Sequence, residues 1–234
     1  MNGASTQVYP QFHPHPSLDT PVFESHGVKE FFLSRDHLVE VFVRVQIKRG
    51  LNPRMTQDAL HSLRVLNLRC SPAQIIDEFK LSHYLQAIAL TICWGTMTRT
   101  KNKYIYCSHD LQHIFDTLDQ CAQSIKQTSS IQQSWDLLPN GLSWTPVMTS
   151  KTLHFLCRAL GFEQDPPVPI DNAVILAYVW PGFRINIPPG QRPQDWSGKT
   201  FAAYCRYMTA ILEWADIKGW STTELESTIF AENR

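Results

Sequence analysis

The chain has 234 residues, no net formal charge at pH 7, and 43% hydrophobic against 18% charged residues. This composition excludes a chain that is disordered throughout, and the length suits one domain that can form a core without disulfides or metals. The six cysteines include no CxxC pair, which argues against a zinc site or an iron-sulfur cluster. We therefore expect reduced core thiols and no metal or other cofactor.

The start of the sequence and its longest apolar stretch suggest the cellular compartment of the protein, and the charge pattern suggests a binding partner. No cationic segment followed by an apolar run opens the sequence, and the apolar residues 87–94 are too few for a membrane span. We therefore expect a cytoplasmic protein without a membrane partner. Lys and Arg exceed Asp and Glu between Arg35 and Arg69. This excess indicates either a solvated helix face or a surface for DNA phosphates, with three candidate contacts: Arg44, Lys48 and Arg49.

The chain begins with an irregular segment. Residues 1–27 are rich in proline, histidine and polar residues without a sustained period, which predicts a mobile arm or strap before a helical domain over residues 28–234. From Arg35 to about Gly50, apolar residues recur at intervals of three and four. This spacing predicts a helix, and a second helix is expected over residues 56–68.

The middle of the chain carries clearer helix signals. Ser71-Pro72-Ala73-Gln74 predicts a helix start, because the serine hydroxyl can accept from the amide of Gln74, whose side chain reaches back, and proline suits the first turn. The apolar residues 84–94 predict a helix that is buried on most sides. Residues 101–107 suggest a loop or short strand, and the amphipathic pattern of residues 108–125 is typical of a helix.

The C-terminal half alternates breaks and helices. Residues 137–141 predict a break, a helix follows over residues 149–160, and Asp165-Pro166-Pro167 predicts another break. Three more helices and a loop or flap complete the chain: helices over residues 171–180 and 199–218 and from the Ser221-Thr222-Thr223-Glu224 capping box onward, and the loop over residues 181–197. No stretch alternates clearly with a period of two, so we expect an all-α fold of about eight helices.

The segment around Lys151 is the most informative for function. Lys151 stands near the start of the predicted helix, and Asp171 follows Val168-Pro169-Ile170. The helix would measure about 18 Å and residues 161–170 can span about 33 Å, so the chain can return and bring Asp171 beside Lys151. The simpler interpretation is a solvated lysine and an aspartate that caps the next helix.

A lysine early in one helix, followed by a Val-Pro-Ile approach to an aspartate, resembles the 8-oxoguanine DNA glycosylase branch of the helix-hairpin-helix superfamily. The resemblance covers residues 135–181 and, more faintly, the C-terminal helices. It implies a single glycosylase-type domain that excises a base from DNA, with Lys151 attacking C1′ of an extruded nucleotide and Asp171 stabilising the charge on the sugar. Bacterial stand-alone relatives of these enzymes act in repair or against foreign DNA.

The resemblance also suggests how DNA is bound. In that family a Gly-x-Gly turn before the lysine binds a phosphate through main-chain amides. Here Leu138-Pro139-Asn140-Gly141 begins like that hairpin but ends well before the lysine. The phosphate contact is therefore either absent or rebuilt from side chains between them: Ser143, Thr145, Thr149 and Ser150. Nearby aromatic residues could stack on a flipped base, although most aromatics belong to the core: Trp144, Trp180, Phe183 and Trp196. His154 could line the same base pocket or be a satisfied structural histidine.

Three interpretations follow from these residues. A glycosylase predicts that Lys151 and Asp171 share a cleft that meets the basic region. A non-catalytic module that binds nucleic acid or a protein on the same fold predicts an exposed Lys151 amine far from Asp171. A helical interaction protein unrelated to nucleic acid predicts no cleft at Lys151. No residue pattern indicates the excised base or an oligomeric state.

Overall fold

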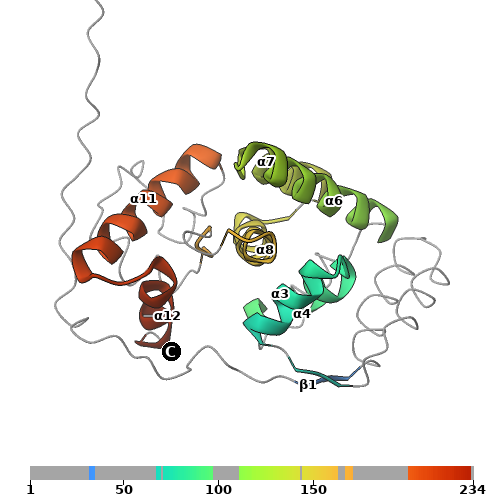
Figure 1. The fold of residues 1–234 in the computed structure, drawn as a ribbon, viewed down its shortest axis with the longest axis horizontal. Helices are drawn as coiled ribbons and strands as arrows, with labels where there is room; N and C mark the ends of the chain where they lie inside the picture. Colours follow the sequence, from blue (N-terminus) through green and yellow to red (C-terminus); the bar gives the residue numbers. More distant parts are fainter. Residues whose placement is uncertain are drawn as a thin grey trace, which may run out of the picture. The chain divides into compact units, whose positions relative to one another are not determined.

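A computed structural model of the chain describes residues 32–34, 67–69, 71–96, 111–142, 144–162, 167–170 and 200–232. They belong to two compact units, which we name the α8 unit, within residues 24–169, and the C-terminal unit, which includes residues 170–234. The elements of the α8 unit are β1 (Phe32–Ser34), β2 (Asn67–Arg69), α3 (Pro72–Lys80), α4 (Tyr84–Thr96), α6 (Leu111–Thr128), α7 (Gln132–Leu142) and α8 (Pro146–Ala159) (Figure 1). Those of the C-terminal unit are α11 (Phe201–Lys218) and α12 (Thr222–Glu232).

The described residues confirm the all-α prediction, since most of them lie in helices. Helices α4, α6 and α11 begin and end within a few residues of their predicted bounds, because apolar side chains at helical spacing mark them in the sequence. The predicted boundary between arm and domain, at residues 27 and 28, lies outside the described residues and stays a prediction. Other predicted segments also lie outside them: residues 35–50, 101–107, 171–180 and 181–197.

Strands β1 and β2 form a short antiparallel ribbon, in which Phe32 pairs with Arg69, Leu33 with Leu68 and Ser34 with Asn67. The prediction of a helix through Leu68 is therefore wrong at its C-terminal end. A strand of this length is too short for a period-two pattern to be recognised. Its stability also depends on a partner far away in the sequence, so no local pattern indicates it.

Serine residues cap two helices. At α3, the Ser71 hydroxyl accepts a hydrogen bond from the Gln74 amide at 3.2 Å, as predicted. The Gln74 side-chain oxygen has no hydrogen-bond partner among the described residues, so the predicted return contact does not form. At α12 the predicted capping box is complete, because the Glu224 amide donates to the Ser221 hydroxyl at 3.2 Å and the Ser221 amide donates to the Glu224 carboxylate at 2.7 Å.

Helix α7 extends further than the sequence predicts. The predicted break at residues 137–141 is wrong, because the helix continues through Pro139 to Leu142. Proline has no N–H to donate to the preceding turn, which weakens a helix interior. Burial of apolar side chains offsets this loss, and the buried residues recur at helical spacing: Trp135, Leu138 and Leu142. Only residues 143–145 then separate α7 from α8, and the two helices pack together.

Helix α8 is the most enclosed of the described helices. It packs against α3, α4, α6 and α7, and Figure 1 shows it end-on, with α6 and α7 on one side and α3 and α4 on another. Every residue from Met148 to Cys157 is buried. The helix therefore has no solvated face along this stretch, and its polar residues lie in the core of the α8 unit.

The C-terminal unit has its own buried face. Helix α11 buries side chains at helical spacing: Tyr204, Tyr207, Ile211 and Trp214. The helix ends at Gly219, whose φ of +67° is in the left-handed region that glycine adopts without strain. Among the described helices of both units, none is long and apolar enough to cross a lipid bilayer.

Candidate active site

Lys151 lies in the second turn of α8. The sequence predicted that it would lie in the first turn. Thr145 caps the helix and Pro146 opens it, three residues before the predicted start at residue 149. Threonine followed by proline is a favourable helix start, because the hydroxyl caps the first amides and proline suits the first position. The field of the helix dipole fades beyond the first turn. The surroundings of the Lys151 amine are therefore set mainly by neighbouring side chains and not by this field.

The Lys151 side chain is buried against an aromatic ring. Its exposed fraction is 5%, and Nζ lies 5.4 Å from the centroid of the Trp94 ring on α4. At this distance an ammonium is attracted to the electron-rich face of the indole. The Trp94 ring also packs edge-on against Phe155, with centroids 5.1 Å apart and an interplanar angle of 84°. Trp94 therefore spans one turn of α8 and contacts both Lys151 and Phe155.

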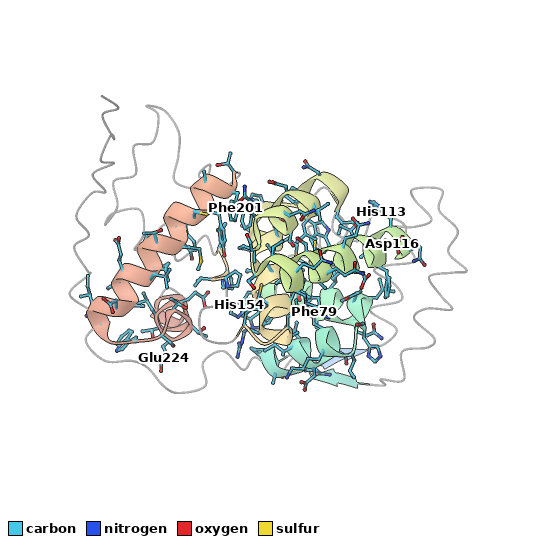
Figure 2. The ribbon with its side chains drawn as sticks, turned by 45° about the horizontal axis from the view of Figure 1, so that its top comes forward. Phe79, His113, Asp116, His154, Phe201 and Glu224 are labelled. Atoms are coloured by element: carbon cyan, nitrogen blue, oxygen red, sulfur yellow. The ribbon has the colours of Figure 1, made fainter. Side chains whose placement is uncertain are left out.

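His154 joins α8 to a second segment of the chain. Its Nδ1 lies 2.8 Å from the carbonyl oxygen of Pro167, and Nδ1 must carry the ring proton because a carbonyl oxygen only accepts. His154, labelled in Figure 2, is 5% exposed. Its ring packs against that of Phe155, with ring centroids 5.0 Å apart. Burial lowers the pKa of His154 to about 4, although the bond to Pro167 opposes this shift. At pH 7 the ring is therefore neutral.

The hydroxyl groups near Lys151 differ in exposure. Thr145 is exposed at the start of α8 and accepts a hydrogen bond from the Met148 amide at 3.4 Å. Thr149 and Ser150 are fully buried, and the Ser150 hydroxyl donates to the Val147 carbonyl at 3.0 Å. The structure describes three of the predicted phosphate contacts, and of these three residues only Thr145 is exposed.

The remaining candidates can be placed only in part. Trp144 comes just before α8 and is buried, with an exposed fraction of 3%. The others lie outside the described residues: Asp171, Ser143, Arg44, Lys48, Arg49, Trp180, Phe183 and Trp196. The meeting of Lys151 with Asp171 in one site therefore stays a prediction.

No family model matches the chain, and no curated protein or solved structure matches it either. Function is therefore inferred from the residues of α8 and their surroundings. Within the described ranges, no group of three or more His, Cys, Asp or Glu side chains is placed to hold a metal ion. The chemistry available at α8 is that of a buried amine, a neutral imidazole and aromatic rings.

Trp94 is the residue of this site that the sequence did not indicate. It stands at the end of the apolar stretch that predicts a buried helix, and this pattern marks it only as a core residue. Its contact with Lys151 joins α4 to α8, which are far apart in the sequence. Because no local spacing links the two positions, the packing of these helices was needed to find the contact.

Proposed function

We propose that the protein is a DNA glycosylase with possible lyase activity, which excises a damaged or modified base through Lys151 and Asp171. The observation that supports the proposal most is the buried position of Lys151 in the central helix, against the Trp94 ring. Lysine is almost never fully buried unless it is paired, so specific contacts such as that with Trp94 hold the Lys151 side chain in the core. A site that excludes water also suits covalent chemistry, because it protects a reactive intermediate from hydrolysis.

The burial of Lys151 favours this function over the alternatives that expose its amine. A solvated lysine and a non-catalytic binding module both predict an exposed amine, whereas the side chain is 5% exposed. The order of residues along the chain is also that of the glycosylases, with Lys151 on α8 and Asp171 after the Val168-Pro169-Ile170 approach.

The proposed reaction starts from a nucleotide that has been extruded from the DNA. The Lys151 amine gives up a proton and Nζ forms a bond to C1′, while the glycosidic bond breaks and the base leaves with its electron pair and is protonated. Asp171 stabilises the positive charge that develops on the sugar and assists the proton transfers. Cleavage of the C1′–O4′ bond then opens the sugar and gives a Schiff base between Nζ and C1′.

The exposed start of α8 is a suitable place for a DNA phosphate. Helix N-termini attract anions through their unpaired amides and their dipole, and the cap residue here is Thr145. The basic residues predicted to extend this surface are Arg44, Lys48 and Arg49. The proposal covers a role in repair or in defence against foreign DNA, because both need the same base excision.

Borohydride trapping tests the proposal. Purified protein is mixed with duplex or single-stranded oligonucleotides that carry 8-oxoguanine or an abasic site, and borohydride reduces any Schiff base to a stable adduct. We expect an adduct with the wild type, none with Lys151→Gln and a much slower one with Asp171→Asn. Lys126→Gln serves as the control, because Lys126 is an exposed lysine on α6 and its loss should not change the adduct yield.

Two outcomes would contradict the proposal. An adduct of equal yield with Lys151→Gln would show that another amine reacts. No adduct with any oligonucleotide, together with no base released from a panel of modified DNAs, would favour the non-catalytic binding module.

A further inference from the structure

Trp94 lies between two side chains of α8. Nζ of Lys151 is 5.4 Å from the centroid of its ring, and the Phe155 ring meets it edge-on, with centroids 5.1 Å apart. Phe155 is fully buried, and Lys151 is 5% exposed. Because α4 and α8 pack together, two whole helices place the indole, and it does not follow the movements of the lysine. The ring therefore offers the Lys151 side chain a fixed surface.

The Lys151 amine needs such a surface if it is to act as a nucleophile. Lysine carries its amine on a flexible stem of four carbons, which has considerable rotamer freedom when nothing holds it. A reaction is fast only when the reacting atoms are kept near each other in the correct orientation, and a small misplacement lowers the rate. The indole face restricts Nζ to one region, since the ammonium is attracted to it.

The ring also acts on the charge of the nitrogen. In the reaction proposed above, a neutral amine attacks C1′, and Nζ becomes positive as it shares its electron pair with the carbon. The protonated Schiff base that follows carries the same charge. An indole face attracts a positive nitrogen, and it has much less attraction for a neutral amine. The contact is therefore stronger in the transition state than in the amine that precedes it, and such a difference raises the rate.

We propose that Trp94 is a positioning residue, whose ring holds Nζ of Lys151 in place for the attack and stabilises the positive charge that this nitrogen gains. This inference rests on the function proposed above. Both residues belong to the α8 unit, so the contact forms within one compact body. The loss of the contact should slow the chemical step more than it weakens DNA binding.

Two substitutions of Trp94 test this role. Trp94→Phe keeps an aromatic face that attracts cations more weakly, and Trp94→Leu keeps an apolar side chain without such a face. Single-turnover adduct formation is measured with saturating DNA, at an alkaline pH where the rate has levelled off and the free amine is neutral in every protein. We expect Trp94→Leu to slow it by about 10- to 30-fold and Trp94→Phe by less, with a Kd for DNA within about 2-fold of wild type.

Fluorinated tryptophans separate the effect on charge from the packing of the ring. Each added fluorine draws electron density from the face of the indole but changes its shape little, so the attraction to a cation weakens while the contacts with the core remain. With these analogues inserted at position 94 alone, the adduct rate should fall stepwise as fluorine atoms are added. A side chain that only fills space would give equal rates across the series.

Trp220 offers a matched control for the fluorinated analogues. Its ring also lies near a lysine, because Nζ of Lys218 is 6.0 Å from the ring centroid. The two residues stand at the end of α11 in the C-terminal unit and have no part in the proposed reaction. The same analogues at position 220 should leave the adduct rate within about 2-fold of wild type.

Nuclear magnetic resonance shows whether the contact exists, whatever the activity of the protein. In protein labelled with ¹³C at the Cε of lysine, the ring current of Trp94 should shift the Hε signals of Lys151 upfield of those of the exposed Lys126. The Lys151 signal is assigned by its disappearance in Lys151→Gln. Its upfield shift should be lost in folded Trp94→Leu.

The outcomes separate failure of this inference from failure of the proposed function. If the wild type forms no adduct, the proposed function fails and the positioning role falls with it, while the Hε signals still decide whether the contact exists. If the wild type forms the adduct, a wild-type rate in folded Trp94→Leu, or equal rates across the fluorinated series, would overturn the inference alone.

Discussion

The buried ring of His154 couples the stability of the protein to pH. Burial lowers its pKa from the ordinary value of 6.5 to about 4, so the folded protein keeps the ring neutral while the unfolded chain takes up a proton near pH 6.5. The resulting stabilisation is fully present above pH 6.5 and is lost as the pH falls from 6.5 to 4. Over this interval the free energy of unfolding should drop by about 3 kcal/mol from this group.

Urea denaturation at several pH values between 7 and 4 measures this effect. We expect a steeper loss of stability in the wild type than in His154→Asn, because the amide side chain does not titrate. Parallel curves for the two proteins across this interval would contradict the assignment of the pH dependence to His154.

Two buried threonines differ in the partner of their hydroxyl group. Thr91 on α4 donates to the Ala87 carbonyl at 2.7 Å, whereas the Thr152 hydroxyl on α8 has no hydrogen-bond partner among the described residues. Both side chains are fully buried, and valine has nearly the same shape. We expect Thr152→Val to raise the free energy of unfolding by about 1 kcal/mol and Thr91→Val to lower it by a similar amount, as chemical denaturation can measure. Equal losses from both would indicate a partner for Thr152.

The helix ends differ in how clearly the sequence indicates them. The Ser71 cap of α3 and the Ser221 capping box of α12 are local, because a side chain bonds to an amide three residues away, and such signals are readable without knowledge of the fold. The path of α7 is not local. Pro139 and Asn140-Gly141 predict a break, but the helix continues because its buried side chains pack where α7 contacts α6 and α8.

Substitution of Pro139 tests this account of α7. Alanine restores an N–H that can donate to the preceding turn, so Pro139→Ala should raise the free energy of unfolding by about 1 kcal/mol or more. Pro146→Ala is the control, because Pro146 occupies the first turn of α8, where its missing N–H is not needed. For Pro146→Ala we expect a smaller or opposite change in the free energy of unfolding. Denaturant unfolding of the two variants measures both changes. A loss of stability from Pro139→Ala would contradict the account.

At the scale of the whole molecule, the enclosure of α8 explains why its polar residues are informative. Four helices pack against it, and Lys151 and His154 contact Trp94, Phe155 and Pro167 within the same unit. The apolar pattern of residues 84–94 predicted one buried helix, but the weaker pattern of α8 did not indicate that it would be the more enclosed one. Burial depends on how many neighbours a helix has, which its own sequence does not specify.

The sequence by itself determined the all-α class, the approximate bounds of α4, α6 and α11 and the serine caps of α3 and α12, because each depends on interactions within a few residues along the chain. It also singled out Lys151 and His154 as candidates through their spacing in a motif. Only the tertiary structure decided that Lys151 is buried against Trp94, that His154 bonds to Pro167, and that residues 67–69 pair with residues 32–34. These contacts join segments that are distant in the sequence, and their formation depends on the packing of whole elements.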